Sequence, residues 1–502
     1  MRNAKKAIAG ILALPLLSGL TACEDTSGGN VGEATTASAA SASDIVTVAI
    51  NTEGLKDGEQ EVIENAMAKL PDVELENKTV KWLAQYDLNP YENGASKSVA
   101  LEMFEQKYGG KVEYYPCTWD DRFDKLSMYV SGGEGIDCFP GDDIYNFPKG
   151  IVNGGGKFQP VDDYIDIDNE IWQNVRQGME LYSFGGKHFN MVTSIAAQEV
   201  CVYNKQTIEE NGLDDPWELY KEGRWNWNTF KDMLMDYVDE EYEHYGLDGY
   251  WAENALYLST GVPLIGTTED GHLVCNINDP MLEKAMDFQY ELYRNGLVLD
   301  RMRLFSSNPE KPNNDEHPEM MGDGRELFYI VGEYSVTGAP ETWPHKIDPE
   351  NVGFVPVPSP EGSLPYQTAK LNGFALCKGA QNPEGVARLA ECTVVASTDE
   401  GAMAISDRKT RDDSGLSDEL IANIKEINEL ARQYPVVDLS SGASAEIASL
   451  TTQAGDDNGT RAAMHGKEWA VTREELAYSL LLLVDEADAK LQAKIAEWEQ
   501  EQ

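Results

Sequence analysis

The chain has 502 residues, with 87 acidic and 40 basic side chains and a formal net charge of −47 at pH 7. Nucleic acids and anionic membrane surfaces are bound through basic patches, so this charge balance argues against both as partners. The residues from 45 to 502 are too many for one small core, and they predict two domains or lobes.

The first 22 residues are typical of a secretory signal, because basic residues at positions 2, 5 and 6 precede an apolar run over 7–20. That run is shorter than the apolar stretch that a membrane-spanning helix needs. It ends in LTAC (20–23), which resembles the bacterial lipobox, so Cys23 is interpreted as a lipidation site rather than a coincidental cysteine. Removal of residues 1–22 takes away three basic and no acidic residues, which moves the formal charge from −47 to −50.

Residues 24–44 are rich in Ser, Thr, Ala and Gly and lack apolar periodicity, which indicates a flexible tether. No other apolar run approaches membrane-spanning length, and the nearest is LAYSLLLLV (476–484). We therefore expect an extracytoplasmic protein that is lipid-anchored to the cell membrane.

Six further cysteines occur, at positions 117, 138, 201, 275, 377 and 392. None forms a C-x-x-C pair or has the His/Cys spacing of a zinc site, so no metal site is expected. An even number in an exported protein permits disulfides, but a chain of this size can equally bury free thiols. The sequence leaves these two alternatives open.

Strand and helix patterns alternate over residues 79–139. Strands are predicted at 79–87, 111–117 and 136–142, separated by helices that start after Ser98 and near Asp120. This order predicts a parallel sheet with helices on both faces, in which ligands bind beyond the carboxyl ends of the strands. The three strand ends carry polar and aromatic residues: Tyr86, Asp87, Thr118, Trp119, Asp120, Asp142 and Asp143.

Each of these acids could be a simple turn or cap residue. Their presence at three successive strand ends favours a site. Helical and loop-rich segments follow over about 200–345, and extended patterns return at 350–360 and 371–380. The last predicted helix carries one apolar stripe, which we expect to dock on the protein itself rather than form a coiled coil. Its members are Leu476, Leu480, Val484, Ala487, Leu491, Ile495 and Trp498.

Motifs for nucleophilic, zinc-dependent or nucleotide chemistry are absent, so neither an enzyme nor a cofactor is predicted. A glycosidase needs only two carboxylates, and 87 acids do not exclude one. The acidic stretch DDYIDIDNE (162–170) lacks the Gly and distal Glu of an EF-hand, and it is interpreted as a solvated turn.

Several segments together resemble the extracytoplasmic solute-binding lipoproteins of carbohydrate ABC importers (solute-binding family 1, related to maltose-binding protein). They are TVKWLAQYD, SGGEGIDCFPGDDIYNFPKGIVNGGGKFQPVDDYI, VCVYNKQTIEENGL, YIVGEYSVTGAP, NVGFVPVPSPEG and NGFALCKGAQNPEGVARLAECTVV, in this order. The resemblance runs from about Val80 to the C-terminus. An added segment at 45–78, a Cys-containing VCVYNK strand and Pro-Val-Asp-Asp in place of Pro-Leu depart from the family pattern.

The resemblance implies a two-lobed periplasmic-binding-protein-like α/β fold, with a mainly parallel sheet flanked by helices in each lobe and hinge strands between them. Lobe one would take 79–197 and 366–406, and lobe two 198–365 and 407–502. A sugar would bind between the lobes, which would close on it, and a monomeric protein would deliver it to ABC importer permease subunits.

By position, the resemblance assigns ligand contacts in lobe one to Tyr86, Asp87, Trp119, Asp120, Asp142 and Asp143. In lobe two it assigns Trp251, Glu253, Asn254, Glu333 and Tyr334, and it places Arg408 near the second hinge. Aromatic rings cover apolar sugar faces, and carboxylates accept hydroxyl hydrogen bonds. Trp343 is assigned to the core.

The stretch EGRWNWNTF (222–230) has the aromatic and amide groups of a sugar platform, but the resemblance makes it a helix start. Asn226 would then cap the helix, and Trp227, Phe230 and Leu234 would share a packed face. Two alternatives remain: the same fold binding a peptide or polyamine, and a lipid-anchored glycan hydrolase.

Overall fold

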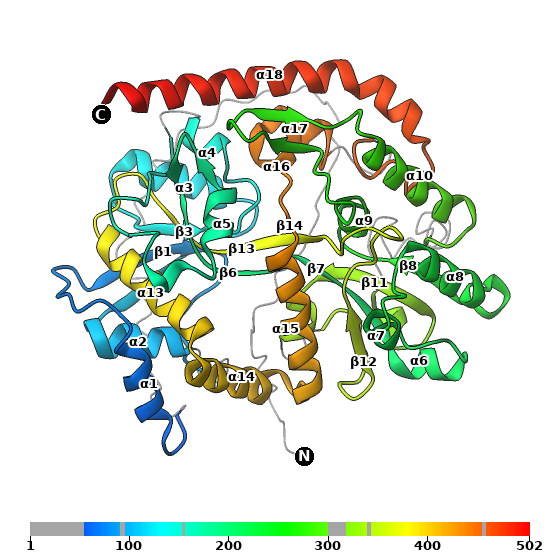
Figure 1. The fold of residues 1–502 in the computed structure, drawn as a ribbon, viewed down its shortest axis with the longest axis horizontal. Coiled ribbons are helices and arrows are strands. Elements are labelled where there is room, and N and C mark those ends of the chain that lie inside the picture. The colour runs from blue at the N-terminus through cyan, green and yellow to red at the C-terminus, as the bar shows by residue number, and fades with distance from the viewer. Residues whose placement is uncertain are drawn as a thin grey trace, which may run out of the picture.

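The structure is a computed structural model that describes residues 55–90, 96–152, 156–299, 318–338, 343–453 and 458–501. The predicted signal, Cys23, the tether and residues 45–54 lie outside this described part. Two lobes lie side by side (Figure 1). Lobe one is built around β1 (Thr79–Ala84), β2 (Lys111–Pro116) and β3 (Cys138–Pro140), and lobe two around β7 (Glu199–Asn204), β8 (Tyr245–Asp248) and β11 (Glu326–Gly332).

Lobe one is built on a sheet with the strand order β14-β13-β3-β1-β2, in which β6 also pairs with β13. The pairs β1–β2 and β1–β3 are parallel, while β13 runs antiparallel to β3 and β6. Its strands are β1 (Thr79–Ala84), β2 (Lys111–Pro116), β3 (Cys138–Pro140), β6 (Asn190–Ala197), β13 (Gln367–Leu376) and β14 (Pro435–Val436). A small hairpin, β4 (Ser183–Phe184) and β5 (Lys187–His188), lies outside this sheet.

Helices cover both faces of this sheet, as the alternating pattern predicts. The Oγ of Ser98 accepts the backbone N–H of Leu101 and caps the first of them, which confirms the predicted start. These helices are α2 (Val99–Tyr108), α3 (Arg122–Gly132), α4 (Lys149–Val152), α5 (Arg176–Leu181), α13 (Pro383–Thr398) and α14 (Glu400–Ser414), with a 3-10 turn η2 (Glu170–Trp172).

The added N-terminal segment packs on lobe one through α1 (Glu59–Met67), beside α2, α13 and α14. Ile63 and Ala66 are fully buried there. Lys69 forms an ion pair with Asp399, with Nζ 2.8 Å from Oδ2. Residues 55–78, the described part of this segment, therefore belong to the lobe-one framework.

Lobe two has a four-stranded sheet in the order β12-β7-β11-β8, in which β8 and β11 are parallel. The strands are β7 (Glu199–Asn204), β8 (Tyr245–Asp248), β11 (Glu326–Gly332) and β12 (Val352–Val355), and a separate hairpin is formed by β9 (Ile265–Thr267) and β10 (Leu273–Cys275). The helices are α6 (Lys205–Glu210), α7 (Pro216–Lys221), α8 (Trp227–Tyr237), α9 (Ala252–Leu258), α10 (Pro280–Arg294) and α12 (Tyr334–Thr337), with 3-10 turns η3 (Glu240–Tyr242) and η4 (Pro318–Met321).

The stretch 222–230 is framework in this lobe. The side chain of Asn226 accepts the backbone N–H groups of Asn228 and Thr229, so it caps α8 as predicted. Trp227 is buried and stacks on Phe288, with ring centroids 4.5 Å apart. Trp225 is also buried, and its Nε1 donates to a backbone carbonyl, so neither indole forms an exposed platform.

The chain passes from lobe one to lobe two at Gln198, between β6 and β7, and returns along β13. Helix α15 (Asp418–Gln433) packs against β6, β12 and β13, and therefore spans both sheets. The second boundary was expected at 406/407, but α14 runs through that position. Because α14 packs on α1, α2 and α13, it lies with lobe one.

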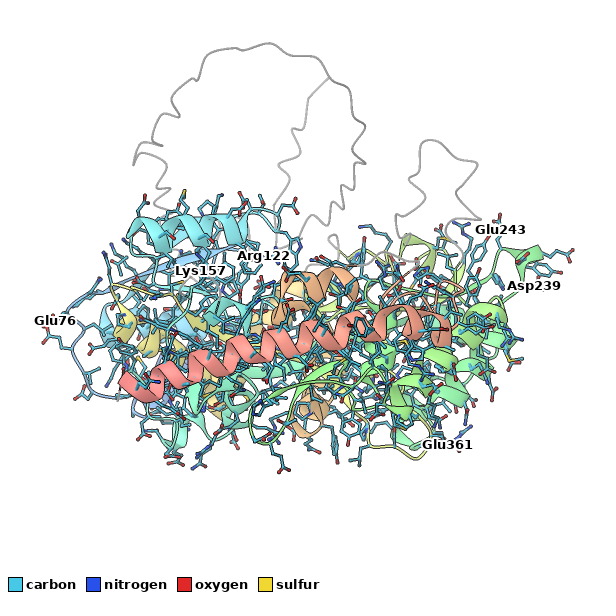
Figure 2. The ribbon with its side chains drawn as sticks, turned by 90° about the horizontal axis from the view of Figure 1, so that it is seen from above. Glu76, Arg122, Lys157, Asp239, Glu243 and Glu361 are labelled. Atoms are coloured by element: carbon cyan, nitrogen blue, oxygen red, sulfur yellow. The ribbon has the colours of Figure 1, made fainter. Side chains whose placement is uncertain are left out.

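The C-terminal region comprises α16 (Ser440–Ala443), α17 (Ala445–Leu450) and α18 (Trp469–Glu501). Helix α18 lies along the long axis of the molecule and extends over both lobes (Figures 1 and 2). The predicted docking of its apolar stripe is confirmed, since Leu480 and Leu491 are fully buried. No helix in the described residues is long and apolar enough to cross a membrane.

The six cysteines of the folded part are free thiols, five of them buried. Trp343 is buried, as expected for a core residue. In the stretch 162–170, Asp162 bonds His188, with Oδ1 2.6 Å from Nδ1. Among the described residues no group of three or more His, Cys, Asp or Glu side chains is placed to hold a metal ion.

Candidate functional site

Tyr86 and Asp142 follow the carboxyl ends of β1 and β3, which are neighbours in the lobe-one sheet. The Tyr86 ring packs edge-on against Trp82, with centroids 5.6 Å apart, and Trp82 Nε1 donates to the Tyr86 carbonyl at 3.0 Å. Burial raises the pKa of Tyr86 well above its ordinary value, and the negative charge of Asp142 raises it further. The phenol and the carboxylate therefore lie at the same sheet edge.

Asp87 closes the turn that follows β1. Its Oδ1 accepts the backbone N–H of Asn89 at 2.9 Å and the Asn89 side-chain amide at 2.8 Å. Burial raises the pKa of Asp87, while these hydrogen bonds oppose the rise. The geometry is that of an Asx turn, in which the carboxylate shapes its own loop.

A lysine that the sequence prediction missed lies beside this edge. Lys370 is on β13, opposite Ala196 of β6, and its Nζ is 3.5 Å from Oδ2 of Asp142. Its only sequence signal is that it is the one charged residue in the strand TAKLNGFALC (368–377). The strand order, in which β13 lies next to β3, brings Lys370 and Asp142 together, and no sequence motif predicts it.

Trp119 and Asp143 are joined by Arg122, another residue that the sequence prediction missed. The guanidinium lies 3.6 Å from the Trp119 ring centroid, and its Nε donates to Asp143 Oδ2 at 2.6 Å. Burial raises the pKa of Asp143, and the Arg122 charge opposes this rise. Asp143 is therefore committed to an internal ion pair, whereas Trp119 is 40% exposed and Asp120 is exposed beside it. Figure 2 labels Arg122 on lobe one.

The aromatic residues of lobe two meet over Gly332, the last residue of β11. A Cβ atom at Gly332 would lie 2.4 Å from Cε1 of Tyr334 and 3.3 Å from Cζ3 of Trp251. Both rings therefore occupy the space that glycine leaves. Trp251 precedes α9 with a φ of 68°, which is an uncommon conformation for a bulky residue and one that concentrates at functional sites.

Glu333 lies between β11 and α12, beside Gln198, where the chain passes from lobe one to lobe two. Its backbone N–H donates to the carbonyl of Gln198 at 3.2 Å, and Gln198 N–H donates to the carbonyl of Thr368 at 2.8 Å. Burial raises the pKa of the Glu333 carboxyl, and the charge of Lys370 opposes the rise. The ammonium that pairs with Asp142 of lobe one therefore also acts, through its charge, on Glu333 of lobe two.

Glu253 and Asn254 are in α9 and make internal contacts. The Glu253 carboxylate is buried, with Oε1 3.3 Å from Arg461 Nε and 2.8 Å from His465 Nε2. Asn254 Oδ1 accepts the hydroxyl of Thr460 at 3.0 Å. Both side chains hold the 458–467 segment to α9.

Arg408 is in α14 and joins this helix to α1. Its Nε and Nη2 donate to the two carboxylate oxygens of Glu59 at 2.7 and 2.9 Å, and Nη1 donates to Asp412 at 2.8 Å. This fork-to-fork geometry is a strong structural pair. The structure does not connect it with the strand-end residues, because α14 packs on α1, α2, α13 and α15.

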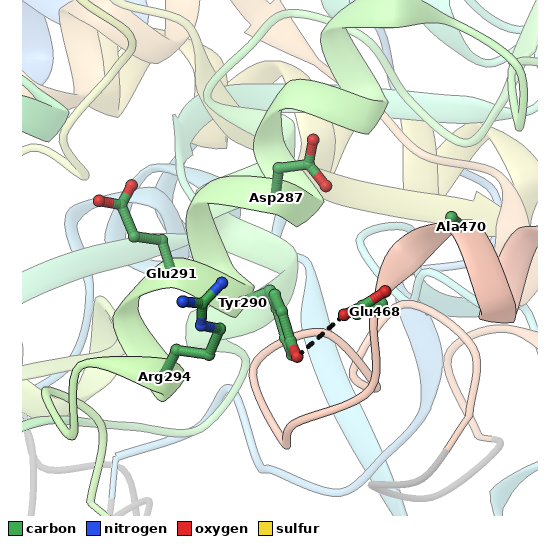
Figure 3. A pocket seen from close by; sticks show the side chains of 6 residues that line it. All are labelled: Asp287, Tyr290, Glu291, Arg294, Glu468 and Ala470. Carbon is green, nitrogen blue, oxygen red and sulfur yellow. Dashed lines mark hydrogen bonds between the residues drawn. The ribbon is translucent and has the colours of Figure 1, made fainter.

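Two pockets lie apart from these residues. One of about 300 Å³ lies between α10 and the start of α18, where Tyr290 donates to Glu468 at 3.3 Å (Figure 3). Its lining residues are Asp287, Tyr290, Glu291, Arg294, Glu468 and Ala470. Another, of about 460 Å³, is lined mainly by apolar residues of α2, α13 and α14. No predicted site residue is among the lining residues of either pocket.

No protein-family model and no curated protein matches the sequence. Solved structures do share its fold. The sugar-binding protein MalE from Xanthomonas citri is 15% identical with a TM-score of 0.56, over 84% of this chain and 99% of that chain. The extracellular solute-binding protein from Staphylococcus aureus, in complex with maltose, is 14% identical with a TM-score of 0.53, over 84% and 99%.

The GacH receptor of Streptomyces glaucescens, solved unliganded and with acarbose, is 16% identical with a TM-score of 0.52. The match covers 80% of this chain and 98% of that chain. At such identities the likeness establishes the fold, and the prediction of a two-lobed α/β fold of the periplasmic-binding-protein type is confirmed.

Proposed function

We propose that this protein captures a sugar or oligosaccharide between its two lobes and delivers it to an ABC-type importer. The observation that carries the proposal is that Lys370 of β13 pairs with Asp142 of lobe one, while its charge also acts on Glu333 of lobe two. We assign Tyr86 and Asp142 of lobe one and Glu333, Tyr334 and Trp251 of lobe two to the ligand site. Two proteins of the same fold support it: one is a sugar-binding protein from Xanthomonas citri, and the other is a solute-binding protein from Staphylococcus aureus in complex with maltose.

The chemistry of these groups suits a carbohydrate. The Trp251 and Tyr334 rings over Gly332 provide apolar faces on which sugar C–H groups stack. The carboxylates of Asp142 and Glu333 accept hydrogen bonds from hydroxyls, and charged acceptors make the stronger bonds. Trp119, exposed on the lobe-one side, offers a further surface for a longer ligand.

Lobe closure would accompany binding, because only a ligand with different contacts in the two arrangements can shift the open–closed equilibrium. Acylation of Cys23 would anchor the monomeric protein to the cell membrane beside the permease subunits. In this proposal Asp87, Asp143 and Asp120 shape or border the lobe-one side. Glu253, Asn254 and Arg408 serve the framework, because their polar atoms are bonded within the protein.

A thermal-shift screen of residues 45–502 tests the proposal. Oligosaccharides, amino acids, peptides and polyamines would be compared, since a ligand well above its dissociation constant raises the melting temperature. We expect stabilisation by a saccharide. Stabilisation by a polyamine or a peptide, with none by any saccharide, would overturn the sugar assignment. Release of reducing ends during incubation would instead indicate a glycan hydrolase.

A further inference from the structure

Lys370 occupies the place where the two lobes meet at the crossing strand. It lies on β13, and its Nζ is 3.5 Å from the Asp142 carboxylate of lobe one. Both side chains are largely covered, with exposed fractions of 28% for Lys370 and 17% for Asp142. An ion pair so shielded from solvent is weakened less by salt than a surface pair.

Backbone hydrogen bonds hold Glu333 of lobe two to the same crossing. The ladder from Glu333 to Gln198 and from Gln198 to Thr368 fixes the end of β11 beside the start of β13. Thr368 and Lys370 are two residues apart on one strand, so their side chains leave the same face of the sheet. The ammonium of Lys370 is the positive charge that offsets the burial of the Glu333 carboxyl.

The other charged groups near this site have partners of their own. On the Asp142 side, burial and the negative charge of Asp142 raise the pKa of Tyr86 and of Tyr182. Asp143 is paired with Arg122. On the β7 side, Glu199 is buried and interacts with the hydroxyl of Thr368. Across lobe two, Glu253 is paired with Arg461 and His465. Lys370 is therefore the cation that pairs with Asp142 and whose charge acts on Glu333.

We propose that Lys370 is a positioning residue of the ligand site: its ammonium pairs with Asp142 of lobe one and its charge also acts on Glu333 of lobe two, so that both carboxylates are ready to accept ligand hydroxyls. This proposal rests on the function proposed above and deepens it. The two carboxylates would repel an anionic ligand, and the ammonium offsets much of the attraction that they would exert on a cationic one. The arrangement therefore suits a neutral polyhydroxylated ligand, whose hydroxyls the carboxylates can accept.

The first test needs no ligand and uses thermal melts of Lys370→Met between pH 5 and 8. Without the ammonium, burial holds the pKa of Glu333 above its ordinary value with nothing to oppose it. A raised folded-state pKa stabilises at low pH, and the benefit is lost as pH rises through that pKa. The melting temperature of Lys370→Met should therefore fall relative to wild type by roughly 2–4 °C as pH rises.

Three variants decide the outcome. Lys370→Arg should restore the wild-type pH profile, because it restores the charge. Adding Glu333→Gln to Lys370→Met should remove the extra pH dependence. Lys231→Met, which removes a lysine paired with Glu291 on lobe two, should keep the wild-type profile. A wild-type profile for Lys370→Met, or an extra slope that persists after Glu333→Gln, would overturn the shared role of Lys370.

The second test measures affinity for the saccharide that stabilises the wild-type protein most. Lys370→Met should weaken binding about tenfold or more, the size of a lost charge-assisted contact, and Lys370→Arg should restore most of it. If no saccharide binds wild type, the proposed function fails, while the pH profiles still report on Lys370 alone. If a saccharide binds wild type and Lys370→Met equally, Lys370 is not a positioning residue.

Discussion

The indole ring of Trp498 packs against the phenyl ring of Phe189, with centroids 5.4 Å apart and 32° between the ring planes. This contact joins the last turns of α18 to lobe one. Closer to its start the same helix is tied to lobe two, where Arg473 Nη1 lies 3.0 Å from Glu283 Oε2 and Asp488 lies 2.8 Å from His272. One helix therefore bridges both lobes.

Trp498→Ala should lower the stability of the protein. Burying a large aromatic side chain in a core is worth about 3–5 kcal/mol, and a partly buried one less, so we expect a loss of roughly 2 kcal/mol. Thermal or urea unfolding would measure it. Tyr478→Ala is the matched control, because Tyr478 is on the same helix and 81% exposed. Equal losses of stability in the two variants would contradict specific packing of the Trp498 end of α18 on lobe one.

Glu253→Gln tests whether this residue belongs to the framework. Breaking a buried ion pair by removing one partner costs about 3–5 kcal/mol. The neighbouring Arg461 and His465 lower the pKa of Glu253 despite its burial. Its contribution is therefore present above the ordinary Glu pKa and is lost as pH falls below it.

The stability difference between wild type and Glu253→Gln should thus be largest above about pH 5, near the ordinary Glu pKa, and should shrink toward pH 3. Urea unfolding across this range would show it, with Glu474→Gln on the exposed side of α18 as control. A variant that stays fully stable but loses ligand binding would instead place Glu253 in the ligand site.

Local signals in the sequence were enough to predict much of the fold. Ser98 and Asn226 cap helices as expected because a short polar side chain next to an apolar helical pattern has a local partner. The stripe of α18 is buried because its period matches the helix. These features depend on neighbours within a few residues along the chain.

The charged contacts depend on partners far along the chain, and sequence pattern does not contain them. Arg408 was expected near the hinge, but its partner Glu59 lies 349 positions earlier in an added helix. Arg461, the partner of Glu253, lies 208 positions later. Lys370 was overlooked for the same reason, since only the strand order brings it to Asp142.

Glu199→Gln should reveal a buried acid at the lobe crossing. Burial raises the pKa of Glu199 to about 8, which the Thr368 hydroxyl only partly opposes. Since the raised pKa means that the folded protein holds a proton, wild type should lose stability as pH rises from the ordinary Glu pKa to about 8. The loss approaches about 1.4 kcal/mol per pH unit in that window.

The glutamine variant lacks this proton and should show a flatter profile, so that it is more stable than wild type at pH 9 and similar to it at pH 5. Melting curves over this range measure the difference. Glu209→Gln, at an exposed position of α6, is the control and should follow wild type. Parallel profiles for wild type and Glu199→Gln would contradict a protonated Glu199.

Trp251→Ala and Tyr334→Ala should each weaken saccharide binding, because each removes a ring that would stack on a sugar face. Loss of one stacked aromatic contact should cost about 0.5–1.5 kcal/mol beyond the lost area, or roughly 2–10-fold in affinity. Titration calorimetry with the best saccharide of the screen measures it. Tyr242→Ala is the control, because Tyr242 is 69% exposed on η3. Unchanged affinity in both site variants would refute the placement.

Gly332→Ala tests the same aromatic pair without removing either ring. The new methyl group would lie 2.4 Å from Cε1 of Tyr334, closer than real contacts allow, so the ring must move. Because the obstacle is a side chain at the lobe surface rather than backbone, the fold should persist while the platform is displaced. We expect saccharide affinity to fall with a change of only a few °C in melting temperature. Gly132→Ala is a control for general effects of the substitution, because Gly132 is exposed in α3 and the added Cβ would meet only Glu134 Cγ, at 4.0 Å. Wild-type affinity in Gly332→Ala would show that the position of Tyr334 does not matter for binding.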